Sequence, residues 1–106
     1  MNAIENQVRD LVKVELDAAN ERFPQFHSQH EGYAVILEEM DELKDAVDVA
    51  DDHLSFAWRY VKGDVTEGVK SHVKYVEEAA MEAACEAIQV AAMCKKFLEM
   101  EAVNGG

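Results

Sequence analysis

The sequence contains few residues that interrupt helices. Only one proline and five glycines occur in 106 residues. No stretch alternates apolar and polar residues in the way a half-buried strand does, and helix-favouring alanine and glutamate are abundant. The sequence therefore predicts an all-α protein, an antiparallel bundle of three to four helices that forms a single domain over residues 1–106.

Basic residues are scarce as well. Ten lysines and arginines stand against 22 aspartates and glutamates, for a formal net charge of −12. This balance argues against duplex nucleic acid and anionic membranes as direct partners. No run approaches 18 uncharged apolar residues, and the first ten residues, MNAIENQVRD, lack the apolar core of a signal peptide. We therefore expect a cytoplasmic protein.

Cysteine is limited to Cys85 and Cys94. Nine positions apart on one predicted helix, they lie about 13 Å apart along its axis, too far for a disulfide to each other. Neither belongs to a CxxC or zinc-type Cys/His pattern, so both are expected to be small buried hydrophobes. His27 and His30 could also form part of a zinc site, but the sequence places no further zinc ligands near them.

Three segments have the periodicity of amphipathic helices. The first is expected from about Asn2 to Arg22, ending before Phe23-Pro24 because the residue before proline is disfavoured in the α region. Its apolar stripe comprises Ile4, Val8, Leu11, Val12 and Ala19. Glu15 falls in the same arc. Its side chain either points toward the core or reaches solvent because this end of the helix separates from the rest of the bundle.

The second helix is expected to begin after Ser28, because Ser28 and Glu31 fit a capping box. Residues 53–62 (HLSFAWRYVK) either continue this helix or turn back, and the sequence leaves both open. The apolar stripe of the helix comprises Ile36, Met40, Leu43, Val47, Ala50 and Leu54. An outer acidic face opposite the stripe comprises Glu38, Asp41, Asp45, Asp48 and Asp52.

The third helix is expected from about Val65 to Glu101, with Asp64 and Glu67 as a second cap. Gly68 in its first turns weakens it by about 1 kcal/mol relative to alanine. The tail, residues 104–106, is expected to fray.

One stretch of the third helix, Ala79 to Met93, is apolar on every side except at Glu82, Glu86 and Gln89. Such a helix is normally buried, so this short chain has more apolar surface than it can cover and is expected to form a homodimer or homotetramer. The three polar positions, spaced i, i+4 and i+7, project from one side. Because carboxylates are rarely buried uncompensated, they need a cation, a basic side chain, a hydrogen-bonding network or open water.

Two acids of the second helix, Glu39 and Glu42, lie on the flank of its apolar stripe and, spaced i, i+3, can reach a common point. If the second and third helices pack antiparallel, this pair faces Glu86 and Gln89 across a groove. Converging carboxyl oxygens without histidine or cysteine form a site suited to Mg²⁺, or to Mn²⁺, and poorly suited to zinc or copper. Such a site neutralises a polyphosphate and activates a bound water to attack phosphorus.

A phosphate clamp also needs basic groups. Lys96, seven residues after Gln89 on the same side of the third helix, is the first candidate for substrate binding, with Arg59 and Lys62 behind it. Each of these is more often a surface charge. Conceivable base-stacking residues, each also explicable as ordinary packing, are His30, Tyr33 and Trp58.

The sequence resembles phage and bacterial MazG-like proteins in two segments, FHSQHEGYAVILEEMDEL (residues 26–43) and EAIQVAAMCKKF (residues 86–97), which together cover about 30 residues. This family belongs to the all-α nucleoside triphosphate pyrophosphohydrolases. Its first motif, EExxE, stands here as Glu38-Glu39-Met40-Asp41-Glu42, and its second, ExxD, aligns with Glu86-Ala87-Ile88-Gln89.

The resemblance implies a Mg²⁺-dependent enzyme that hydrolyses a (d)NTP to a (d)NMP and pyrophosphate, with Glu39, Glu42 and Glu86 as metal ligands and catalytic carboxylates. It also implies an assembly of two or four chains. Gln89 stands where the family has aspartate, and a neutral amide is a poorer magnesium ligand. Glu82, one turn before Glu86, can substitute as the fourth acid.

A second function stays open beside the enzyme. The chain can instead be a catalytically weak or inactive helical interaction protein whose outer acidic face binds a basic partner. Binding that persists in Glu39→Gln but is lost when the outer acidic face is neutralised distinguishes this function from the first.

Overall fold

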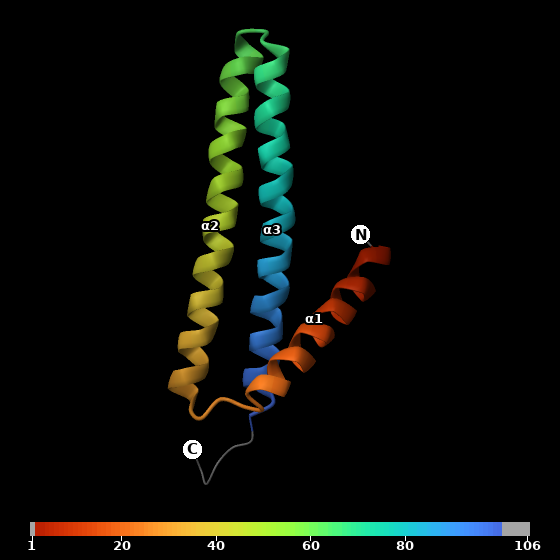
Figure 1. The fold of residues 1–106 in the computed structure, drawn as a ribbon, viewed down its shortest axis with the longest axis vertical. Coiled ribbons are helices and arrows are strands. Elements are labelled where there is room, and N and C mark those ends of the chain that lie inside the picture. The colour runs from red at the N-terminus through yellow and green to blue at the C-terminus, as the bar shows by residue number, and fades with distance from the viewer. Residues whose placement is uncertain (1, 101–106) are drawn as a thin grey trace. The chain divides into compact units, whose positions relative to one another are not determined.

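The protein is all-helical in the computed structural model, which describes residues 2–100 (Figure 1). Helix α1 spans Asn2–Arg22, α2 spans Gln29–Lys62 and α3 spans Thr66–Leu98, and there is no strand in this part of the chain. The chain divides into two compact units: a first unit, Met1–Met40 with Ala87–Gly106, and a second unit, Asp41–Glu86. Both units include parts of α2 and α3, so the expectation of a single domain stays a prediction.

The start of α2 has the serine half of the expected capping box. The Glu31 amide donates to Ser28 Oγ at 3.1 Å, which satisfies one of the free amides of the first turn. The Glu31 carboxylate pairs instead with His27, at 2.9 Å from Nδ1. Farther along, α2 continues without interruption through the aromatic run to Lys62, which settles the alternative that the sequence left open.

The turn between α2 and α3 ends α2 with a Schellman motif. The Val65 amide donates to the Tyr60 carbonyl and the Asp64 amide donates to the Val61 carbonyl. Asp64 takes the left-handed position of this motif, with φ of 54°. The expectation that Asp64 caps α3 is therefore wrong, because an N-cap residue has extended rather than left-handed backbone.

The other end of α3 also differs from the sequence expectation. The helix ends at Leu98 rather than at Glu101. Glu101 and the tail at 104–106, which we expected to fray, lie outside the described residues.

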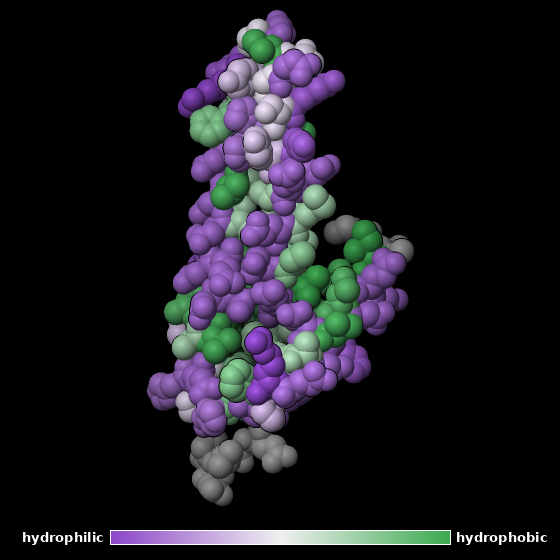
Figure 2. Space-filling view, viewed as in Figure 1, coloured by the Kyte–Doolittle hydropathy of each residue, from purple (hydrophilic) through white to green (hydrophobic). Residues whose placement is uncertain are grey.

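The core of the first unit lies between α1 and the last turns of α3. Val12, Leu16 and Ala92 are buried there, with Ile88, Ala91 and Met93 packed around them. Of the expected α1 stripe, Val12 is buried and Ala19 half-buried, whereas Ile4 is 53% exposed and Val8 and Leu11 are exposed as well. Figure 2 shows hydrophobic side chains at the surface along α1.

The second unit is an antiparallel hairpin of α2 and α3 (Figure 1). Its buried apolar residues are three alanines, Ala46, Ala57 and Ala79, and larger ones such as Leu54 and Met81 stay exposed. Small side chains at the contact let the two helices lie close together. This close approach leaves little room between them for larger side chains such as leucine.

Exposure along α3 corrects the expectation for the cysteines. Cys85 is exposed and Cys94 only half-buried, so Cys85 is not the buried hydrophobe that its apolar neighbours suggested. Between Ala79 and Met93 only Ala79 and Ala92 are buried, which leaves most of this apolar stretch in contact with solvent in the single chain. Among residues 2–100, no helix is both long enough and apolar enough to cross a membrane.

Candidate metal centre

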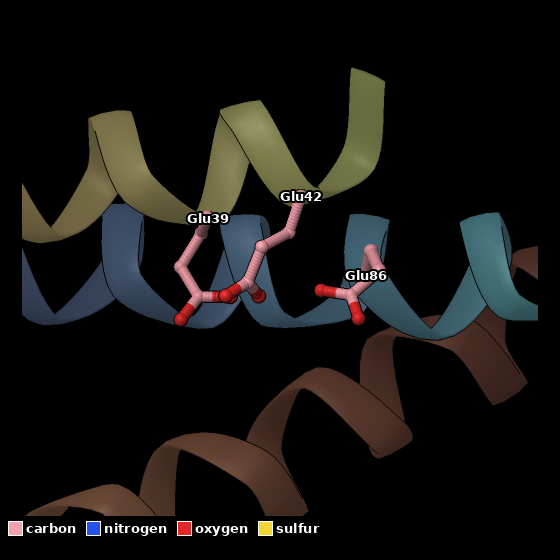
Figure 3. A group of neighbouring side chains, drawn as sticks. All are labelled: Glu39, Glu42 and Glu86. Atoms are coloured by element: carbon pink, nitrogen blue, oxygen red, sulfur yellow. The ribbon is translucent and has the colours of Figure 1, made fainter. Parts of the chain in front are cut away.

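Three carboxylates predicted from the sequence as metal ligands lie together (Figure 3). Glu42 on α2 faces Glu86 on α3, and Glu39 precedes Glu42 by one turn of α2. Each residue offers one oxygen, and these oxygens all lie within 4.8 Å of one another.

Helix geometry and small neighbours produce this arrangement. Residues spaced i, i+3 lie on one face of a helix, which aligns Glu39 with Glu42. The antiparallel register of the hairpin then sets Glu86 opposite Glu42, in the same register that brings His53 to His72 and Tyr60 to Gly68. Buried Ala46 and Ala79 lie beside the acids and let the two helix backbones approach.

The electrostatics of Glu86 are unfavourable without a cation. Burial raises the pKa of Glu86 above its ordinary value near 4.5, and the hydrogen bond and charge of Glu42 and the charge of Glu82 raise it further. Glu86 Oε2 is shielded from solvent and has no hydrogen-bond partner among the described residues. A positive ion beside these oxygens would lower the pKa of Glu86 and would give Glu86 Oε2 a partner.

The oxygen spacing fits a small hard cation after a minor adjustment. Oxygens bound to Mg²⁺ at about 2.1 Å lie about 3.0 Å apart when adjacent and about 4.2 Å apart when opposite. A spread of 4.8 Å therefore closes onto one ion with side-chain shifts of well under 1 Å. The donor set is all carboxylate, which favours Mg²⁺ or Mn²⁺ over zinc or copper.

An acidic cavity of about 400 Å³ adjoins Glu42 and Glu86 within the second unit. Glu82 lines it, as expected for a substitute fourth acid, and so does Asp45. Asp45 was expected on the outer acidic face of the second helix. Its side chain is exposed, but it stands at the rim of this cavity, because α2 turns the i+3 position after Glu42 toward α3.

A second, larger cavity of about 620 Å³ lies in the first unit, and Glu39 and Gln89 both line it. Gln89 and Glu39 thus both line a ligand-sized space. The apolar part of this wall includes Phe23, Phe26 and Met93. Its charged part comprises Glu15, Arg22, His27, Glu31, Glu39 and Lys96.

Of the residues that line this cavity, Arg22 was not predicted from the sequence, whereas Glu15 was one of two alternatives. Arg22 was seen only as the end of the first helix, and its place at the cavity depends on how the loop after it folds. Glu15 is half-buried at the cavity wall, as the inward-facing alternative required, and its position in the apolar arc was the signal.

Lys96 lines the larger cavity but is not a free cation. Its side chain is 4% exposed, its ammonium donates to the Phe23 carbonyl, and it lies 5.1 Å from the centre of the Phe26 ring. The Lys96 carbonyl in turn accepts from Gln25 Nε2 at 2.9 Å. Lys96 therefore anchors the loop between α1 and α2, a role that the helical spacing did not indicate.

The other two proposed basic residues lie far from the carboxylates in the same chain. Arg59 and Lys62 follow Glu42 on α2 by 17 and 20 residues, about 25 and 30 Å along the helix. Arg59 lies over the Phe56 ring at 5.2 Å and Lys62 over the Trp58 ring at 5.7 Å. Within one chain the structure does not bring them to the metal centre.

Of the candidate aromatic and histidine residues, some line a cavity and others do not. Tyr33, Trp58 and His30 are exposed and line neither cavity, whereas His27 does line the larger one. The hydrogen bond from His27 lowers the pKa of Glu31, with its charge adding to the effect. His27 and His30 gather no third metal-binding side chain among the described residues, where the three glutamates form the group of three or more side chains that could hold an ion.

The chain matches no protein-family model, and no curated protein or solved structure is detectably similar to it.

Proposed function

We propose that the protein is a Mg²⁺-dependent nucleotide pyrophosphohydrolase of MazG-like type, which converts a (d)NTP to a (d)NMP and pyrophosphate. The observation that carries this proposal is the convergence of Glu39, Glu42 and Glu86, which the sequence motifs select independently of the coordinates. Mn²⁺ is the alternative ion, because it shares the preference for carboxylate oxygens.

The chain's own residues divide the work in this proposal. Glu39, Glu42 and Glu86 would hold the ion, which would supply positive charge to the triphosphate and lower the pKa of the attacking water. The water oxygen bonds to the α-phosphorus as the bond to the bridging oxygen breaks, and pyrophosphate leaves with that electron pair. Glu82, at the rim of the acidic cavity, accepts the proton of the water.

The larger cavity supports the proposal with space for the rest of a nucleotide. Its volume of about 620 Å³ is in the range of small-molecule sites, and one of the three carboxylates, Glu39, lines it. Phe23 and Phe26 supply the apolar surface, and Arg22 is the basic side chain at its rim that can meet a phosphate.

A homodimer or homotetramer is part of the proposal. Three alanines are the buried apolar residues of the second unit, and exposed Val47, Leu54, Val73 and Met81 are left on its two helices. Exposed apolar side chains on a pair of helices whose buried apolar residues are alanines are what a face that packs on another chain would need. Light scattering at micromolar concentration should give at least twice the chain mass of 11.9 kDa, and a monomer mass would contradict the assembly.

Pyrophosphate release from a panel of standard and damaged (d)NTPs, with Mg²⁺ or Mn²⁺, tests the activity. Glu42→Gln and Glu86→Gln should each lower the rate about 100-fold or more, a loss of about 3 kcal/mol of transition-state stabilisation. Glu78→Gln is the matched control, because Glu78 is an exposed acid of α3 that lines neither cavity. No release from any substrate, or full rates in both glutamine variants, would contradict the proposal.

A second candidate is the helical interaction protein. All five acids of the outer acidic face, Glu38, Asp41, Asp45, Asp48 and Asp52, are exposed on α2. A single-signed face of this kind steers oppositely charged partners. Pull-down of a basic protein that persists in Glu39→Gln and is lost on neutralising the face would favour this candidate.

A further inference from the structure

We propose that His53 and His72 form a chelating site for Cu²⁺ or Ni²⁺ in the second unit. His53 on α2 and His72 on α3 lie with their Nδ1 atoms 3.0 Å apart, and both side chains are half-buried. The pair joins the two helices of the hairpin and has no part in the proposed hydrolysis.

Aromatic neighbours hold both rings in place. Tyr75 stacks on His53 with ring centres 4.7 Å apart and planes at 24°, and Tyr60 stacks on His72 at 5.4 Å and 21°. Phe56 contacts both imidazoles, at 6.0 and 5.4 Å between ring centres. Two ligands held in fixed orientation lose little freedom when they bind an ion, which favours chelation.

The nitrogen separation indicates which metals fit. With metal–nitrogen bonds of about 2.0–2.1 Å, two nitrogens 3.0 Å apart subtend about 91–97° at the metal. This is close to the 90° of square-planar and octahedral complexes, which Cu²⁺ and Ni²⁺ adopt. A tetrahedral zinc ion would need the nitrogens about 3.3 Å apart, so zinc should bind more weakly.

Metal binding replaces the hydrogen bond between the rings. In the pair as it stands, one Nδ1 carries a hydrogen and donates to the lone pair of the other. Chelation requires both Nδ1 lone pairs, so the donor ring changes tautomer and carries its hydrogen on Nε2. No net proton is lost, and the imidazoles stay neutral.

The site is separate from the carboxylates in both position and chemistry. His53 follows Glu42 by 11 residues, about 16 Å along α2. Imidazole nitrogens prefer late transition metals, whereas carboxylate oxygens prefer Mg²⁺. Water fills the remaining coordination positions, because no third metal-binding side chain joins the pair in the part of the chain that the structure describes.

Calorimetric titration of the full chain with NiCl₂ tests the proposal, with no nucleotide and with excess Mg²⁺ to occupy the carboxylates. The wild type should bind about one Ni²⁺ per chain, and more weakly Zn²⁺. His53→Gln and His72→Gln should each weaken Ni²⁺ binding roughly tenfold or more. The chain has four histidines, so the double variant His27→Gln/His30→Gln is the matched control and should bind like the wild type.

Equal affinity in His72→Gln, or loss of binding in the double variant, would overturn the proposal. Circular dichroism shows whether each variant keeps its helices. The electron paramagnetic resonance spectrum of the Cu²⁺-loaded wild type gives a readout that needs no variant: two histidine nitrogens support the site, and one or none overturns it. Because no substrate is present, these results do not depend on the proposed hydrolysis.

Discussion

The two units of the chain bury different kinds of residue. The first unit has a core of Val12, Leu16 and Ala92, and its buried Lys96 is satisfied by the Phe23 carbonyl. In the second unit the buried residues are alanines, and the contacts between its helices include two polar pairs, Glu42 with Glu86 and His53 with His72.

This contrast suggests a different sensitivity of the two units to pH and metal ions. Side-chain packing and a satisfied lysine do not depend on ions in solution. The carboxyl of Glu86, whose pKa is raised, responds to pH, and the two polar pairs are the groups of this unit that can bind a metal ion. We therefore expect solution conditions to affect the second unit much more than the first.

The largest effect should come from a packing change in the first unit. Leu16→Ala should lower the free energy of unfolding by about 2–4 kcal/mol, because it leaves a cavity against Ala92. The loss, measured by urea unfolding, should be the same with and without Mg²⁺.

The same substitution at Leu11 is the control, since Leu11 is 52% exposed on the same helix. Leu11→Ala should cost under about 1 kcal/mol in the monomer. An equal cost at the two positions would mean that the exposed face of α1 is buried in an assembly.

A smaller effect is expected at Gly68 in the second unit. A Cβ there would overlap with the ring of Tyr60, which stacks on His72. Gly68→Ala should therefore destabilise the protein by about 1–2 kcal/mol, although alanine favours helix by about 1 kcal/mol.

Double-mutant analysis isolates the Tyr60 contact. In a Tyr60→Ala background, Gly68→Ala should become stabilising, because only the helix preference remains. Destabilisation that persists in that background would show that Tyr60 is not the cause.

The smallest effect should appear when the charge of Glu86 is removed. Because folding raises the pKa of Glu86, the folded protein holds that proton more tightly than the unfolded chain. Its contribution to stability is thus complete below the ordinary pKa near 4.5 and is lost as the pH rises through the raised value.

Glu86→Gln should accordingly raise Tm by a few degrees at pH 8 and leave it unchanged near pH 4. Mg²⁺ should raise Tm of the wild type at pH 8 and have less effect on the variant. A lower Tm for Glu86→Gln at pH 8 would show that the carboxylate is stabilising as an anion.

Local features of the fold were predictable from the sequence. The bounds of α1 and the position of the Ser28 cap agree with the structure, because periodicity, proline and capping residues act over a few positions. The shared direction of Glu39 and Glu42 is likewise a property of one helix.

Features that depend on the register between helices were not predictable. The apolar arc expected for α1 included Ile4, which is exposed, and left out Leu16, which is buried, because burial depends on which residues of α3 lie opposite. The contact of His53 with His72 and the anchoring role of Lys96 arise for the same reason. Arg59 and Lys62 were predicted to bind substrate phosphates from their charge alone, and about 25 and 30 Å of α2 separate them from Glu42 in one chain.

Titration with Mn²⁺, followed by the loss of its free-ion electron paramagnetic resonance signal, tests the metal centre most directly. The wild type should show saturable binding that is lost in Glu42→Gln and Glu86→Gln and kept in Glu78→Gln. No saturable binding by the wild type, or equal binding by the Glu86→Gln variant, would contradict the assignment of these carboxylates to a divalent ion.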